Sequence, residues 1–187
     1  MKKIKLIFTL SIIFVMFSGF WSGKNSYQQK EERLIHSINT IELLYKHLPQ
    51  TRRMVSRSYG FATFSNLGLN FASISGEGGE GLAHNNRTGK NTYMNMASGG
   101  IGFGMGIKEF HTVFLFANKK AFDDFVHHGW EANAGADAAA KLDNQGEALN
   151  LAVTVAPGVR LYKLTQSGLA LQATLHGTKY WKDGDLN

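Results

Sequence analysis

The 187 residues are enough for one domain with a sizeable core, and a hydrophobic content of 43% excludes a wholly disordered chain. The absence of cysteine excludes disulfides, cysteine-ligated zinc and a cysteine nucleophile, while 21 glycines against 2 prolines indicate tight turns and flat strands. The formal net charge is +6, but residues 24–187 carry only 17 basic and 14 acidic side chains, a net charge of +3 that does not support a nucleic-acid partner.

Residues 1–23 have the pattern of a secretory signal peptide. Met1–Lys5 is basic, and Leu6–Trp21 is uncharged and rich in leucine, isoleucine and phenylalanine. Phe20 and Trp21 interrupt the small residues of the cleavage end, so a retained membrane anchor is the alternative, with an apolar run at the short limit for a span. The sequence therefore predicts an exported protein of the periplasm or cell envelope, membrane-anchored if the leader is retained.

An amphipathic helix is expected after a polar linker over 24–30, and Pro49 ends it. Its large apolar residues recur at intervals of three and four, at Leu34, Ile38, Ile41, Tyr45 and Leu48, with Ile35 and Leu44 widening the stripe. A further short helical turn is expected over 51–57. The regular spacing predicts one apolar face along this helix.

From Tyr59 onward, short apolar runs separated by glycine, asparagine and aspartate indicate strands. The expected strands are 59–65, 69–75, 79–84, 91–97, 100–108, 111–117, 130–141, 147–156, 158–164 and 168–176, with a hairpin loop at 85–89. Asn118 is expected to cap an inserted helix that Gly129 stops. The predicted fold class is α+β: an N-terminal amphipathic helix packed on a mainly antiparallel, curved β-sheet or barrel-like sandwich, with one short inserted helix.

Several segments in a fixed order carry a resemblance to a known family. They are Arg57–Phe64, the Ser-Gly-Glu-Gly-Gly-Glu-Gly-Leu run at 75–82, the glycine-alternating run at 99–107, the Val113–Phe125 unit with its paired lysines, Gly129–Ala139 and Gly168–Ala173. The set resembles the lipid-binding SYLF domain family, in its secreted bacterial branch, over residues 31–182, which leaves 183–187 as a tail. The resemblance implies a non-enzymatic module whose partner is an anionic phospholipid, of phosphoinositide type in eukaryotic members, or a membrane surface.

Two glycine-rich motifs allow more than one interpretation. Gly76–Gly81 fits the G-x-G-x-x-G spacing, but strands flank it, so a turn or bulge is expected rather than a nucleotide site. Gly100, Gly102, Gly104 and Gly106 alternate with large apolar residues. The bare strand face that they create is either crossed closely by another element or forms the floor of a groove for an acyl chain.

No catalytic or metal-binding constellation is visible in the sequence. His127 and His128 are expected at a helix end, where a cation suits the helix dipole. Asp123 and Asp124 are adjacent, so on a helix they point about 100° apart and do not form a catalytic pair. The prediction is therefore a protein that is not an enzyme, with no catalytic residue, no metal and no cofactor.

The functional candidate is a basic arm, defined as Lys46, Arg52, Arg53 and Arg57, beside the apolar Met54. Residues 24–57 carry a net charge of +4 against −1 for 58–187, and basic residues near an anionic lipid surface contribute about 1 kcal/mol each. Two alternatives stay open: the apolar stripe contacts a membrane, or it packs on the sheet while the arginines are solvated. The corresponding functions are phospholipid binding and an envelope structural or protein-interaction module.

Overall fold

The computed structural model describes residues 24–71, 74–100, 106–131, 152–165, 168–169 and 178–187. The predicted leader at 1–23 lies outside these residues, as do most of the predicted strands at 130–141 and 168–176 and the first part of 147–156. None of the helices in the described ranges is long and apolar enough to cross a membrane.

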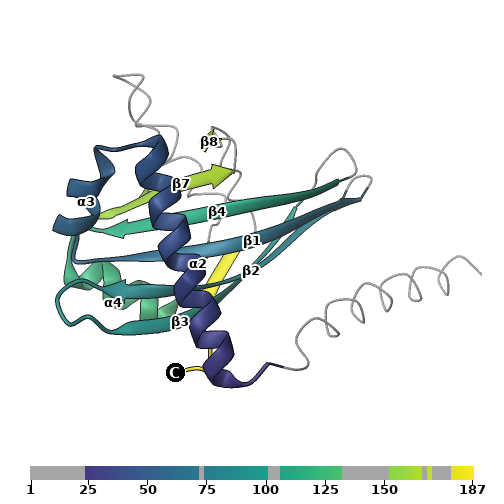
Figure 1. The fold of residues 1–187 in the computed structure, drawn as a ribbon, viewed down its shortest axis with the longest axis horizontal. Helices are drawn as coiled ribbons and strands as arrows, with labels where there is room; N and C mark the ends of the chain where they lie inside the picture. Colours follow the sequence, from purple (N-terminus) through teal and green to yellow (C-terminus); the bar gives the residue numbers. More distant parts are fainter. Residues whose placement is uncertain (1–23, 72–73, 101–105, 132–151, 166–167, 170–177) are drawn as a thin grey trace, which may run out of the picture.

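The strands of the described residues form one antiparallel sheet that curls into a half-barrel (Figure 1). They are β1 Gly60–Phe71, β2 Ile74–Asn85, β3 Asn91–Gly100, β4 Gly106–Phe116, β5 Trp130–Glu131, β6 Val153–Ala156, β7 Val159–Thr165, β8 Gly168–Leu169 and β9 Thr178–Lys182. Their order is β5-β9-β3-β2-β1-β4-β7-β6, with β8 beside β7. The predicted α+β class with a curved antiparallel sheet is confirmed, as a single sheet rather than the two layers of a sandwich.

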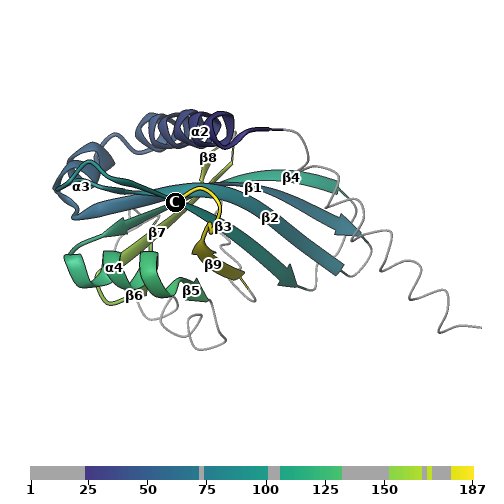
Figure 2. The same ribbon diagram turned by 90° about the horizontal axis from the view of Figure 1, so that it is seen from below.

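Helices cover both faces of this sheet. Helices α2 (Ser26–His47) and α3 (Thr51–Arg57) lie on the convex face, and α4 (Lys119–His128) lies on the concave face (Figure 2). The predicted short helix at 51–57 is confirmed as α3. Helix α4 is also confirmed: Asn118 Oδ1 accepts a hydrogen bond from Ala121 N–H at 2.9 Å, and Gly129 follows the last turn with φ 74°.

The first strands are longer than predicted. The pairing of β1 with β2 runs without a break from Gly60 opposite Asn85 to Phe71 opposite Ile74. The turn or bulge expected at Gly76–Gly81 is therefore wrong, because this run lies within β2. A Cβ added at Gly81 would lie 1.9 Å from the Thr63 carbonyl oxygen. Glycine therefore lets strands β1 and β2 approach closely in the middle of the sheet, and not at a turn.

Two further strand predictions need correction. The strand expected at 100–108 is not one strand, because Gly100 belongs to β3 and residues 106–108 belong to β4, which does not neighbour β3 in the sheet, while 101–105 lie outside the described residues. Strand β9 has no counterpart among the predicted strands, although its Thr178 and Tyr180 are buried and Lys179 between them is exposed. A five-residue segment with two lysines carries too little apolar periodicity to be recognised. The hairpin loop at 85–89 is confirmed, with Gly89 N–H donating to the Asn85 carbonyl oxygen at 2.8 Å.

The hydrophobic core has one part on each face of the sheet. On the concave side α4 packs onto an aromatic cluster, in which the Phe64 and Tyr180 rings lie 4.7 Å apart and the Phe114 and Phe125 rings 5.0 Å apart. On the convex side the C-terminal half of α2 and α3 pack onto β4 and β7, through Ile41, Leu44, Leu48, Val55, Val113, Leu115, Tyr162 and Leu164. The sheet is thus fixed from both sides where the two cores overlap.

Candidate functional site

Helix α2 begins earlier than its apolar pattern predicts. Asn25 Oδ1 accepts from Gln28 N–H at 2.9 Å, and Gln28 Oε1 accepts from Asn25 N–H at 3.2 Å, which is a capping box. The helix therefore starts at Ser26, and the linker predicted over 24–30 is wrong for most of its length. The Asn-x-x-Gln spacing of this cap stands in the sequence at 25–28, well before Leu34, the first residue of the apolar stripe.

The buried face of α2 is largely polar. It consists of Arg33, Ser37, Thr40, Ile41 and Leu44. Thr63 Oγ1 of β1 donates to Ser37 Oγ at 2.8 Å, so part of the helix rests on the sheet through hydrogen bonds. The predicted apolar face is confirmed toward the C-terminus and wrong toward the N-terminus, where the exposed fractions are 41% for Leu34, 50% for Ile35 and 55% for Ile38.

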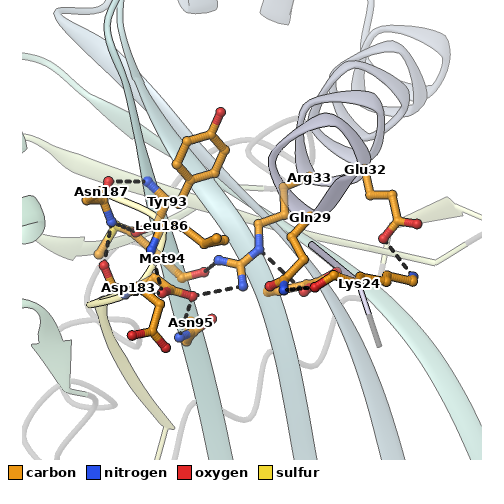
Figure 3. Close-up of polar contacts among 12 residues, drawn as sticks. Lys24, Gln29, Glu32, Arg33, Tyr93, Met94, Asn95, Asp183, Leu186 and Asn187 are labelled. Atoms are coloured by element: carbon orange, nitrogen blue, oxygen red, sulfur yellow. Dashed lines mark hydrogen bonds and ion pairs between the residues drawn. The ribbon is translucent and has the colours of Figure 1, made fainter. Parts of the chain in front are cut away.

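Arg33 is the centre of the polar contacts beneath α2 (Figure 3), with only 1% of its surface exposed. Its Nη1 donates to the Met94 carbonyl oxygen at 3.0 Å, and its Nη2 donates to Asp183 Oδ2 at 2.9 Å. Its Nε lies 3.3 Å from Glu80 Oε2, an ion pair without hydrogen-bond alignment. We call Arg33, Glu80, Asn95 and Asp183 the Arg33 cluster; it ties α2 to β2, β3 and the C-terminal turn.

Asp183 holds the end of the chain against β3. Asn95 Nδ2 donates to its Oδ2 at 3.0 Å, and the N–H groups of Asp185 and Leu186 donate to its Oδ1 at 2.9 and 3.2 Å (Figure 3). Burial alone raises the pKa of Asp183, but these hydrogen bonds and the Arg33 charge lower it below its ordinary value. Residues 183–187, predicted as a tail, are therefore an ordered turn with Leu186 buried.

A groove lies beside α2 on the convex face. We call it the α2 groove; its cavity volume is about 300 Å³. One wall is formed by Leu34, Ile38 and Ile41 of α2, and the floor includes Phe61 of β1 and Leu82 of β2. His84 and Asn91, which join through a 2.7 Å hydrogen bond, line it where the β2–β3 hairpin turns. The exposed apolar side chains of α2 thus lead into an apolar groove.

The structure brings the predicted basic arm to one end of the convex face. Lys46 stands in the last turn of α2, and Arg52, Arg53 and Arg57 are exposed on α3. Met54 is half-buried and packs on the convex core, where Tyr162 Oη donates to its sulfur at 3.7 Å. Met54 is therefore occupied within the fold, and the most exposed large apolar side chains of the described residues belong to α2.

Arg52 connects α3 to the outer side of α2. Its guanidinium lies 4.3 Å from the centre of the Tyr45 ring, and its Nη2 lies 3.5 Å from Glu42 Oε2. Glu42 also lines the α2 groove. Both side chains of the pair are about 60% exposed, so the pair contributes little to stability but places a cation at the mouth of the groove.

The alternating glycines do not form a continuous face in the described residues. Gly100 ends β3 and Gly106 begins β4, strands that are not neighbours in the sheet, and Gly102 and Gly104 lie outside the described residues. The predicted groove over Gly100, Gly102, Gly104 and Gly106 therefore includes residues outside the described ranges, and it stays a prediction. The α2 groove is formed by other residues.

The acidic and histidine residues singled out by sequence have local partners. Asp123 and Asp124 pair with Lys119 and Lys120, one helical turn earlier in α4. His128 stands in the last turn of α4, as expected. Within the described ranges, no group of three or more His, Asp or Glu side chains is arranged to hold a metal ion.

A buried lysine lies on the concave face. Lys163 Nζ of β7 is 3.6 Å from Glu77 Oε1 and 4.3 Å from the centre of the Phe110 ring. Next to it, Asn66 Nδ2 donates to Thr112 Oγ1 at 3.3 Å. A carboxylate and an aromatic face together stabilise a buried cation, so these contacts account for Lys163 as part of the sheet interior.

The sequence interpretation missed both the Arg33 cluster and the α2 groove. The buried positions of α2 recur at helical spacing, at Arg33, Ser37, Thr40 and Leu44. Three of these residues are polar, so they do not contribute to an apolar stripe in the sequence. The partners of Arg33 lie between 47 and 150 residues away in the chain, so no local pattern reveals them.

Comparison with known proteins gives one informative match. No protein family model matches the chain. The chain is 34% identical over 162 residues to a protein of Aeromonas veronii named Beta cell expansion factor A. The match covers 84% of this chain and 59% of that protein, so the chain spans somewhat more than half the length of its relative.

Proposed function

We propose that this protein is a non-enzymatic module of the SYLF type that binds anionic phospholipid membranes at the cell envelope, through the convex face of α2 and α3. The observation that carries the proposal is that Leu34, Ile35 and Ile38 stand exposed on α2 while the arginines of α3 stand exposed on the same face. Contiguous exposed apolar side chains mark interaction surfaces, and basic neighbours favour an anionic one.

The expected free-energy contributions of the basic and apolar side chains agree with reversible binding to a membrane surface. Each basic side chain near an anionic bilayer contributes about 1 kcal/mol, and full burial of one isoleucine contributes about 1.5–3 kcal/mol. Arg53 and Arg57 have no charged partner among the described residues, so they are available to lipid phosphates. The contributions of α2 and α3 would add, because both helices lie on the convex face (Figure 2).

Two features of the sequence support the same function. The motifs between Arg57 and Ala173 follow one another in the same order as in the SYLF family, whose members bind phospholipids. Residues 1–23 have the pattern of an export signal. The name of the Aeromonas relative describes an effect of that protein on beta cells, and the present proposal concerns membrane binding alone.

The test is co-sedimentation of the full chain with vesicles. Vesicles of phosphatidylcholine with phosphatidylglycerol are expected to retain the protein, and vesicles of phosphatidylcholine alone are expected to retain much less. The bound fraction should fall as salt rises from low concentration to about 0.5 M, because salt screens charges at the surface. Binding that is equal for both vesicles and insensitive to salt contradicts the proposal. A partner protein captured independently of lipid would favour the interaction module instead.

A further inference from the structure

We propose that the α2 groove binds one acyl chain of an anionic phospholipid, with the phosphate head group at the basic end of the groove. The inference rests on the proposed function and goes beyond it, because attachment to a membrane surface needs no groove. It assigns a single lipid to a defined site between α2, β1 and β2.

The lining of the groove suits an aliphatic chain. Leu34, Ile38 and Ile41 form the wall, and the floor reaches Leu82, which is 1% exposed. The wall runs from Leu34 to Glu42, about 12 Å at 1.5 Å per helical residue. A cavity of about 300 Å³ stands at the small end of the range for ligand pockets, which fits one chain rather than a whole two-chain lipid.

Basic side chains lie toward one end of the groove. His84 and Asn91 line the end from which the β2–β3 hairpin loop projects, and this loop carries the exposed Arg87 and Lys90. Arg52 stands across the groove mouth, paired with Glu42. This end of the groove thus has one lining carboxylate, paired with Arg52, and a neighbouring loop with two exposed cations, a balance that favours a lipid phosphate.

The hairpin loop is held in place beside α3. Asn86 Nδ2 donates to the carbonyl oxygens of Val55 and Ser58, at 2.8 and 3.2 Å. Asn85 N–H donates to the Lys90 carbonyl oxygen at 2.9 Å and closes the loop. The basic end is thus a built part of the surface, bounded by α3 on one side and the hairpin on the other.

Charge disfavours a second copy of the chain as the occupant. A two-fold contact between α2 helices, centred midway between the exposed Ile35 and Ile38, would place Glu31 of one copy beside Glu42 of the other. Both glutamates are exposed, and like charges in contact destabilise an interface. An amphiphile with a negative head meets the arginines and lysines instead.

The test uses the full chain and lysophosphatidylglycerol with one saturated chain, kept below its critical micelle concentration so that no bilayer or micelle forms. Native mass spectrometry counts the bound lipid, and a titration gives the dissociation constant. One lipid per protein is expected. Glycerol 3-phosphate, which offers the head group without the chain, is expected not to bind.

Two tryptophan variants locate the site. Ile38→Trp fills the groove and is expected to weaken lysophosphatidylglycerol binding about tenfold or more, as displacement of two buried methylene groups predicts. Asn39→Trp is the matched control, because Asn39 is exposed at the next position of the same helix but neither lines the groove nor belongs to the exposed apolar side chains of the proposed membrane-binding face. Its dissociation constant should be unchanged. Both positions are exposed, so both variants should fold.

Four outcomes would overturn the inference. Equal losses in both variants would indicate that the lipid does not occupy the groove. A lipid-free dimer that only Ile38→Trp disrupts would assign the groove to self-association. Vesicle binding without any binding of monomeric lysophosphatidylglycerol would remove the acyl-chain site and leave the proposed function intact, whereas failure of both assays would remove both.

Discussion

Arg33 is the residue on which the position of α2 depends most. It is a buried cation shared among a backbone carbonyl oxygen of β3 and two carboxylates, Glu80 and Asp183. Breaking a buried ion pair by removing one partner leaves the other charge uncompensated, which costs more than the pair contributes when intact. The contact is therefore more important for fixing the position of the helix than for total stability.

Arg33→Met should lower the free energy of unfolding by about 3–5 kcal/mol, because Asp183 and Glu80 lose their cation. Urea unfolding followed by circular dichroism measures it. Arg52→Met is the matched control, an exposed arginine paired with an exposed glutamate, and should change stability by less than about 1 kcal/mol. Equal effects in the two variants would contradict the role assigned to the Arg33 cluster.

Strand β2 shows why glycine is needed inside a strand of this sheet. A Cβ at Gly81 would lie 1.9 Å from the Thr63 carbonyl oxygen and 2.7 Å from the Phe64 ring, whereas a Cβ at Gly99 on β3 would meet nothing within 4 Å. The glycine-rich run therefore serves the pairing of β1 and β2. The pairing of β1 with β2 accounts for Gly79 and Gly81 of the G-x-G-x-x-G run, where a Cβ would lie within 3 Å of the β1 backbone.

Gly81→Ala should destabilise the protein by about 3 kcal/mol, the upper part of the range for overpacking. Gly99→Ala should be neutral within about 0.5 kcal/mol, because its Cβ has open space. Thermal unfolding of the two variants provides the comparison. A Gly81→Ala protein as stable as Gly99→Ala would mean that the strands are not paired as described.

At the level of elements, the sequence predicted local features well. The cap at Asn118, the stop at Gly129 and the 85–89 loop are correct because each depends on a few neighbouring residues. The face that α2 buries was not predictable, because Arg33 and Ser37 are buried by partners on distant strands. The α2 groove depends on that helix orientation, so the sequence could not reveal it either.

At the level of the whole molecule, the two sides of α2 differ in polarity: the side toward the sheet is largely polar and the outer side is apolar in its first half. Its buried side carries hydrogen bonds and the Arg33 cluster, and its outer side carries isoleucines beside the basic arm. The helix is thus held to the sheet partly by polar contacts, which leaves apolar side chains for an external partner. The antiparallel α+β class was predictable from the alternation of apolar residues and from the turns. Strand β9 was not, because the burial of Tyr180 in the concave aromatic cluster depends on residues that are distant in the sequence.

Acidification should reduce stability in two steps. Burial lowers the pKa of His111 below its ordinary 6.5, so the unfolded chain takes up a proton first and stability falls as pH drops below about 6.5. The pKa of Asp183 is lowered below 3.8, so its contribution is present above that pH and is lost as pH falls through the folded-state value. Urea unfolding from pH 8 to 2 measures both steps.

The His111→Gln variant separates these contributions. It should remove the first step and leave the second, because Asp183 lies in a different cluster. A stability profile that is flat between pH 7 and 5 in the unmodified protein would contradict the buried, neutral state of His111. A second step that persists in Asp183→Asn would show that other carboxylates cause it.

Membrane binding through the convex face is tested most directly by charge reversal on α3. The variant Arg52→Glu, Arg53→Glu, Arg57→Glu should lose most co-sedimentation with phosphatidylglycerol vesicles, because about 1 kcal/mol is lost for each cation and repulsion is added. The matched control reverses Lys119, Lys120 and Lys182, which are exposed outside α2 and α3 and carry the same total charge. That control should bind nearly as the unmodified protein does. Equal binding by the arginine variant and the unmodified protein would contradict the proposed membrane-binding face.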